Sequence, residues 1–385
     1  MGAGNALSRP FLSLLGRAPA QARAADYVPP GRSSRQASSR GRGPGGMGLD
    51  RDGGGADPGA AAEPARPPLA GDGRALRRGF RKGELFMSAS VYRTVAQLKG
   101  LSQKNCAPMP EPARVLMCPP DHYEGRDERN PFAAGHVGRI NRHLARKQWQ
   151  EVCDAFSACG LKVSLMPALP GLADMVFCAN QTFVGLTQKM ERLCLLGSLR
   201  YASHRGEAAA FEAWFREAGY RVVALKNRTM TFGGSGDALW HPGKRLVWGG
   251  CGFRSDAASY EELARLYGAP VVVLKLVNER FPQLDTCFCP LTQETVLIYP
   301  SAFDAASLEL IFRLFPVIIT AAEPEAVRQM ACNAVVVSGK TVILQRGAVN
   351  AARHLAALGL DIVEVDTSEF IKGGGGIHAM KMFVY

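Results

Sequence analysis

Five times along this chain, a helix-like pattern ends at a glycine or proline and runs directly into a short strand rich in β-branched residues. The breaks recur at intervals of 43 to 59 residues, at Gly160, Gly219, Gly268, Pro316 and Gly359. Glycine or proline commonly stops a helix before a buried strand. Five such breaks at similar spacing are not expected of an arbitrary α/β chain. The spacing predicts five repeated units in which each break has an equivalent position.

Each unit also contains strand-like runs ahead of its helix. The first convincing core strand is 115–118, and later runs are 175–179, 182–186, 246–249, 295–299, 335–337 and 341–344. Two strands, a helix and a further strand, repeated five times, have an obvious closed arrangement around a pseudo-fivefold axis. The predicted fold class is therefore an α/β propeller of five ββαβ modules, whose loops converge at the centre.

The N-terminal part of the chain has a different composition. Most of the formal net charge of +12 comes from residues 1–86, so the remainder is only mildly basic and no nucleic-acid partner is expected. Residues 1–25 are Arg-rich, free of acids and amphipathic, which is typical of a transit peptide, although an unstructured tail gives a similar composition. Few large apolar residues follow, which predicts disorder up to residue 86. We expect a linker with a short helix over 87–111 and the folded domain over 112–385.

Ten cysteines are scattered through apolar segments without a CxxC pair. This pattern favours free, buried thiols in a reducing intracellular compartment, either mitochondrial or cytoplasmic. The seven histidines show no metal-ligand spacing, and no phosphate-binding or dinucleotide-binding motif stands between a strand and a helix. We therefore expect no metal and no cofactor. No apolar run approaches the roughly 20 residues of a membrane helix, so no membrane partner is expected.

Four consecutive glycines, 373–376, stand near the C-terminus. Glycine in a helix or strand costs backbone entropy, so this run marks a sharp bend or a close approach of the backbone to another group. We expect that group to be a ligand.

The glycine run and two other segments, 232–239 and 283–291, resemble motifs of the guanidino-group-modifying superfamily, the penteins. The similarity covers about residues 112–384 and is greatest to dimethylarginine dimethylaminohydrolases, citrulline hydrolases and arginine deiminases. It implies the five-bladed pentein α/β propeller. In the family, a Cys thiolate attacks the guanidinium or ureido carbon, a His protonates the leaving amine and then activates water, and carboxylates hold the planar cation.

The chain departs from the family at the three positions that carry this chemistry. Gly233, Gln283 and Ala379 stand where the family has its Glu, His and Cys. Glutamine cannot exchange a proton near pH 7, which removes acid–base catalysis worth about 10²- to 10⁴-fold, and alanine abolishes the covalent route. The resemblance therefore predicts a catalytically inactive member of the group.

The binding residues of the family have matches here. Asp174 and Asp285 match guanidino-binding acids, Asp237 is retained in its motif, and Arg254 matches the arginine that meets a substrate carboxylate. These four residues are the candidate substrate-binding set, for an arginine-like or citrulline-like amino acid.

Three neighbouring residues could in principle replace the lost groups. Cys287 and Cys289 are expected to be packing residues, since the family motif has both. His378 adjoins Ala379, but neighbours on an extended chain point to opposite faces. We therefore do not expect the two cysteines or His378 to replace the lost catalytic groups.

Two further functions remain open from the sequence. One is an active hydrolase or amidinotransferase that cleaves C–N bonds of arginine derivatives with rearranged catalytic residues. The other is a structural or interaction protein with a vestigial pocket. Either function allows a homodimer or a heterodimer.

Overall fold

The computed structural model describes residues 90–125, 130–133, 135–136, 138–199 and 205–385. The whole of the expected N-terminal tail, residues 1–86, lies outside these residues. The described part is a mixed α/β fold with five separate β-sheets. Four sheets have three strands each, and the fifth has four.

The elements follow one another along the chain in a regular order. The strands are β1 (Val91–Tyr92), β2 (Arg114–Met117), β3 (Lys162–Leu165), β4 (Thr182–Leu186), β5 (Arg192–Leu196), β6 (Arg221–Val223), β7 (Ala238–Trp240), β8 (Val247–Cys251), β9 (Val271–Lys275), β10 (Phe288–Pro290), β11 (Thr295–Ile298), β12 (Val317–Thr320), β13 (Val335–Val337), β14 (Thr341–Gln345), β15 (Asp361–Val365) and β16 (Lys381–Val384). The α-helices are α1 (Arg142–Ala158), α2 (Arg205–Glu217), α3 (Ser259–Tyr267), α4 (Ala305–Leu314), α5 (Glu323–Arg328), α6 (Val349–Ala357) and α7 (Ser368–Ile371).

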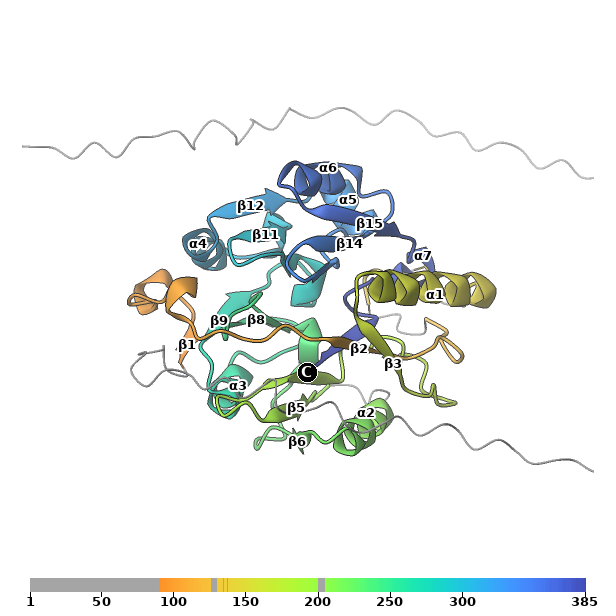
Figure 1. Ribbon diagram of the computed structural model, residues 1–385, viewed down its shortest axis with the longest axis horizontal. Coiled ribbons are helices and arrows are strands. Elements are labelled where there is room, and N and C mark those ends of the chain that lie inside the picture. Colours follow the sequence, from red (N-terminus) through yellow and green to blue (C-terminus); the bar gives the residue numbers. More distant parts are fainter. Residues whose placement is uncertain (1–89, 126–129, 134, 137, 200–204) are drawn as a thin grey trace, which may run out of the picture. The chain divides into compact units, whose positions relative to one another are not determined.

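The five predicted breaks do occupy equivalent positions. Each lies between the end of a helix and a strand that pairs in parallel with the strand before that helix. Four of the five are glycines in the left-handed region, with φ between 61° and 85°, a conformation that glycine adopts without the steric cost of a Cβ. Figure 1 shows α1, α2, α3, α4 and α6 on the outside and the strands toward the middle.

Each sheet also has one strand that is antiparallel to its neighbour. In the first sheet this strand is β16, so the C-terminal end of the chain completes the sheet that β2 and β3 begin. The other strands of this kind are β4, β7, β10 and β13. The short strands β5, β7, β10 and β16 were not among the predicted runs.

One predicted strand is wrong. Residues 175–179 form turns rather than a strand, although all five are apolar and buried. Apolar composition alone does not distinguish a buried turn from a buried strand. This turn joins parts of the candidate site through Ala179, which bonds to Ala379 and Ser235.

Residues 90–111 are packed against the domain and do not form a free linker. Strand β1 pairs in parallel with β9, and two 3-10 turns replace the expected short helix. Tyr92, Leu98 and Leu101 are buried in the largest hydrophobic cluster. This stretch therefore contributes to the core.

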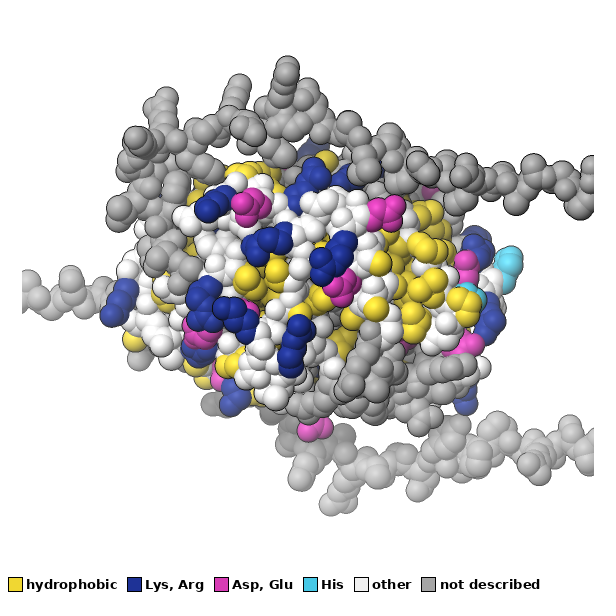
Figure 2. Space-filling model, turned by 90° about the horizontal axis from the view of Figure 1, so that it is seen from below, with side chains coloured by type: hydrophobic (Ala, Val, Ile, Leu, Met, Phe, Trp, Pro, Cys, Tyr) yellow, Lys and Arg dark blue, Asp and Glu magenta, His cyan; other side chains and the backbone are white. Residues whose placement is uncertain are grey.

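The ten cysteines are all unpaired, and eight of them are buried. None of the helices in the described ranges combines the length and apolar character that a membrane span requires. On the face seen in Figure 2, Lys and Arg side chains are spread among hydrophobic and acidic ones and form no continuous basic patch.

Candidate functional site

The turn that follows β6 is organised by a buried acid. Ser255 Oγ donates to Asp237 Oδ2 at 2.6 Å and accepts from Gly233 N at 2.9 Å. Leu284 N donates to Asp237 Oδ1 at 3.0 Å. Burial raises the pKa of Asp237 to about 6. Both oxygens of this carboxyl are used by the protein itself, so the structure gives Asp237 a role in joining two turns.

Glycine is required in this turn because other groups occupy the space of a side chain. A Cβ at Gly233 would lie 2.6 Å from Asp237 Oδ2 and 3.3 Å from Gln283 Nε2. A Cβ at Gly236 would lie 2.5 Å from the same Gln283 nitrogen. Two of the three altered family positions, Gly233 and Gln283, are therefore in direct proximity.

The third altered position joins them through the 175–179 turn. Ala379 O accepts from Ala179 N at 3.1 Å, and Ala179 O accepts from Ser235 N at 2.8 Å. The next residue of the turn, Asn180, accepts at Oδ1 from Gln283 Nε2 at 3.1 Å. Residues 179 and 180 thus bond to Gln283, to Ala379 and to the turn that contains Gly233.

Asn333 holds the same region from another side. Its Oδ1 accepts from Gly376 N at 3.0 Å and from Ala379 N at 3.2 Å, while its Nδ2 donates to Asp285 O at 3.0 Å. One buried amide therefore fixes the glycine-rich loop relative to Asp285.

Asp285 is the acid at this site with an unsatisfied atom. It is 2% exposed, and its Oδ1 has no hydrogen-bond partner among the described residues. Burial, followed by the charge of Asp237, raises its pKa to about 7. A buried carboxyl oxygen without a partner is costly unless a ligand or solvent supplies the hydrogen bond.

The other two predicted binding residues are Asp174, which lies just before the 175–179 turn, and Arg254, which precedes Ser255. Asp174 N donates to Glu207 Oε1 at 3.1 Å, and the charge of Asp174 contributes to raising the pKa of Tyr123, after burial. Tyr123 packs against Phe177 in the turn. The charge of Arg254 lowers the pKa values of both Asp237 and Asp285 against the larger effect of burial, so Arg254 acts on both acids.

The glycine-rich loop approaches the chain's own side chains, which corrects the expectation of a ligand there. A Cβ at any of residues 373–376 would come within 3.0 Å of another atom. The side chains met are those of Tyr123, Asn130, Phe177, Asn333 and Ala379. Gly374 also has a φ of 85°. The loop needs glycine because it is tightly packed.

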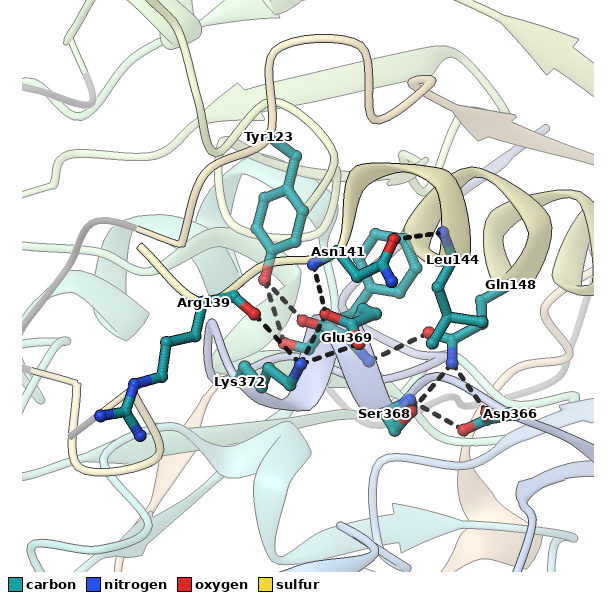
Figure 3. Close-up of polar contacts among 10 residues, drawn as sticks. Tyr123, Arg139, Asn141, Leu144, Gln148, Asp366, Ser368, Glu369 and Lys372 are labelled. Atoms are coloured by element: carbon teal, nitrogen blue, oxygen red, sulfur yellow. Dashed lines mark hydrogen bonds and ion pairs between the residues drawn. The ribbon is translucent and has the colours of Figure 1, made fainter. Parts of the chain in front are cut away.

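Helix α7 anchors the start of this loop (Figure 3). The Glu369 carboxylate pairs with Lys372 Nζ at 2.7 Å and accepts from Asn141 N at 2.9 Å. Tyr123 OH donates to Glu369 O, and Glu369 N donates to Gln148 Oε1 at 3.0 Å. These bonds tie the loop to the N-terminal half of α1.

The possible replacement groups are not suited to catalysis. Burial raises the pKa of Cys287 well above its usual range and that of Cys289 to about 12, so both are protonated thiols of the core. His378 lies in a turn and not on an extended strand, which corrects the expected geometry. Its Nε2 faces Ser235 O at 3.1 Å, and burial lowers its pKa well below the usual range.

Several residues that shape the site were not singled out from the sequence. They are Asn180, Ser255, Asn333 and Lys381. Lys381 had a usable signal, because it is the one charged residue in the apolar run 379–384. The two asparagines had none, since a single Asn in a loop is usually a turn residue. Within the described ranges, no three His, Cys, Asp or Glu residues are placed to hold a metal ion.

Comparison with known proteins identifies the family. Residues 127–385 match the family model described as N,N-dimethylarginine dimethylhydrolase, eukaryotic. The chain belongs to the dimethylarginine dimethylaminohydrolase family. It is thus a member of the pentein superfamily, as its motifs indicated.

Relatives of this family member include a dimethylarginine dimethylaminohydrolase and two bifunctional arginine dihydrolases. The N(G),N(G)-dimethylarginine dimethylaminohydrolase of Mycobacterium tuberculosis is 32% identical over 276 residues, which cover 72% of this chain and 87% of the relative. The bifunctional arginine dihydrolase/ornithine cyclodeaminase ArgZ of Synechocystis is 36% identical over 278 residues, or 72% of this chain. The matched part spans only 38% of ArgZ and of its Nostoc counterpart AgrE.

The fold of the family member agrees with a solved relative. The crystal structure of the N-terminal domain of ArgZ, a substrate-bound arginine dihydrolase variant, matches with a TM-score of 0.66 and 36% identity. The match covers 70% of this chain and 97% of that domain. The mixed α/β fold is therefore the one shared by these hydrolases.

Proposed function

We propose that this chain is a catalytically inactive family member that binds an arginine-like or citrulline-like amino acid without hydrolysing it. The observation that carries the proposal is that Gly233, Gln283 and Ala379 are brought into one region by Asn180, Asn333 and their neighbours. Asn333 also holds Asp285 there, and the buried Oδ1 of Asp285 has no partner among the described residues. The chemical groups of the family are missing, while an acid that can meet a guanidinium remains.

The absence of turnover follows from what these residues can do. Ala379 offers no electron pair to attack the guanidinium carbon. Gln283 donates its amide hydrogen to Asn180 and has no proton to transfer to a leaving amine. The nearby thiols of Cys287 and Cys289 are protonated, and a protonated thiol is a poor nucleophile.

Retained binding has separate support. Asp285 can supply a charge-assisted hydrogen bond to a planar cation, and the positive charge of Arg254 acts on Asp285 and on Asp237. A variant of AgrE, in which one cysteine is replaced by alanine, was solved as a binary complex with L-arginine. Arginine binding in that relative therefore does not require that cysteine.

The repeat suggests the wider organisation. We propose that the five sheets surround one pseudo-fivefold axis as a pentein propeller over about residues 112–385, because all five share one strand order. Residues 1–86 remain a proposed tail and possible mitochondrial transit peptide, with a cytoplasmic location as the alternative. Dimer formation is a proposal without a candidate interface.

Ligand binding can be tested by thermal shift with arginine, citrulline and methylated arginines. We expect arginine-like ligands to raise the unfolding midpoint of the protein without product formation. Asp285→Asn should remove the shift, because it removes the negative charge. The control Asp361→Asn, which loses an exposed carboxylate paired with Lys340, should keep it.

Two outcomes would contradict the proposal. Turnover of arginine or methylarginine by the unchanged protein, lost in Asp285→Asn, would establish an active hydrolase with rearranged residues. No midpoint shift with any ligand would favour an interaction protein with a vestigial pocket.

Restoring the family residues gives an independent test. Gly233→Glu, Gln283→His and Ala379→Cys together should recover some hydrolysis, and each alone almost none, since such groups act as a unit. Gly233→Glu also displaces Asp237, whose Oδ2 would lie 2.6 Å from the new Cβ. We therefore expect the triple variant to be less stable than the parent, and recovery by one single variant would contradict the reading.

A further inference from the structure

A cavity of about 130 Å³ lies beside the candidate site, lined largely by apolar residues of β4, β7, β10, β13 and β16. Trp240, Phe288 and Val336 are among its walls. It reaches the surface near Glu111 and Ser338, which are both exposed. Ser235, His378 and Lys381 line it as well. A cavity of this size and character can hold a small apolar molecule.

Lys381 is the unusual group of this cavity. It is 2% exposed, and no ion pair of Lys381 is found within the described part of the chain. Its Nζ lies 3.2 Å from His378 Nδ1 and 4.3 Å from the centroid of the Phe383 ring. Lysine is almost never fully buried without a charged partner.

The neighbouring histidine fixes the direction of the hydrogen bond. His378 Nε2 faces Ser235 O, and a carbonyl oxygen only accepts, so Nε2 carries the ring hydrogen. Nδ1 is then an acceptor, and Lys381 Nζ donates to it. A neutral amine satisfies this contact with one of its two hydrogens and keeps its lone pair.

We propose that Lys381 is a carbonyl-reactive amine that condenses with small apolar aldehydes entering this cavity. The nitrogen lone pair attacks the carbonyl carbon, and a carbon–nitrogen double bond forms. The carbonyl oxygen leaves as water with the two amine hydrogens, so no oxidant or reductant is consumed. The product is an imine, and the reaction is reversible.

The electrostatics agree with this geometry. Burial lowers the pKa of Lys381 to about 7, while the charge of Asp285 acts in the opposite direction. Desolvation of lysine in an apolar pocket is a known way to obtain a nucleophilic amine near neutral pH. His378, the remaining titratable neighbour, has its pKa lowered well below the usual range and adds no positive charge.

An uncharged carbonyl compound fits better than a carboxylate. The charge of Asp285 acts on Lys381, and Glu111 is an exposed lining residue of the cavity. Both acids repel an anion once they are ionised. The apolar walls favour a ligand without charge. This inference does not rest on the proposed arginine binding, because it needs only the amine of Lys381 and the apolar walls of this cavity.

The test is reductive labelling of the full chain with butanal and cyanoborohydride at pH 7, followed by peptide mass mapping. Lys381 should be labelled about tenfold or more above the exposed Lys189, because a pKa near 7 leaves a far larger neutral fraction than the ordinary value near 10.4. In denaturant this preference should disappear, because the cavity is lost. Lys381→Met, with its folding checked by thermal unfolding, should lack the label.

Three outcomes would overturn the proposal. The first is native labelling of Lys381 no greater than that of Lys189. The second is a preference that survives in denaturant, which would come from the local sequence and not from the cavity. The third is stabilisation by butanoate without labelling by butanal, which would make the cavity an anion site.

Discussion

A single buried acid links the chemistry of this site to its stability. The pKa of Asp285 is raised from 3.8 to about 7, chiefly by burial. The native state therefore favours the protonated carboxyl. The protonated Asp285 thereby adds to the free energy of unfolding relative to an ionised carboxylate. This addition is fully present below pH 4 and is lost as the pH rises through about 7.

Asp285→Asn should reveal this effect, because asparagine does not titrate. The unfolding free energy of the variant minus that of the parent should increase by about 1 kcal/mol per pH unit between pH 4 and 7. Urea unfolding over that range measures it, with Asp361→Asn as the control for loss of an exposed carboxylate. A difference that stays constant, or falls, would show that Asp285 is already ionised in the native state at low pH.

The turns and loops of the site depend on side-chain amides that hold backbone groups. Asn333 is the clearest case, since it bonds to Gly376, Ala379 and Asp285 through backbone atoms. It is 2% exposed, so water cannot replace it. The glycine-rich loop keeps its position because one amide satisfies three otherwise unpaired groups.

Asn333→Ala should lower the unfolding free energy by about 3 kcal/mol, because it leaves these buried groups without partners. Asn350→Ala is a matched control, since Asn350 is exposed and its side chain donates to Glu325. We expect the control to cost less than about 1 kcal/mol. Equal losses in urea unfolding would mean that the loop does not depend on Asn333.

Sequence patterns predicted the regular parts of these elements better than the site. The five breaks follow from local chemistry, because glycine or proline stops a helix wherever it stands. The turn at 175–179 and the contacts of Asn333 depend on residues more than 40 positions away in the chain. Such contacts leave no local pattern, so an apolar turn was read as a strand.

At the scale of the whole molecule, strands from both described ends of the chain pair with strands that are distant in sequence. Strand β16 pairs with β2, and β1 pairs with β9. The pairing of β16 with β2 was not predicted, because β16 is short and begins at the charged Lys381. Both pairings join segments distant in sequence, which makes the domain dependent on residues on either side of the repeated units.

Truncation separates the tail from the packed N-terminal stretch. A chain beginning at Met87 should keep the unfolding midpoint of the full chain, because residues 1–86 have few apolar residues to bury. A chain beginning at Pro112 removes β1 together with buried Tyr92, Leu98 and Leu101. Each buried side chain is worth about 1.5–3 kcal/mol.

The second truncation should therefore lower the midpoint by about 10 °C or more, since 1 kcal/mol corresponds to about 2–4 °C in a domain of this size. The measurement is the thermal unfolding midpoint of the full chain, the Met87 chain and the Pro112 chain in one buffer. A lower midpoint for the Met87 chain would show that the tail packs on the domain. An unchanged midpoint for the Pro112 chain would show that residues 90–111 add no stability, despite the burial of their apolar side chains.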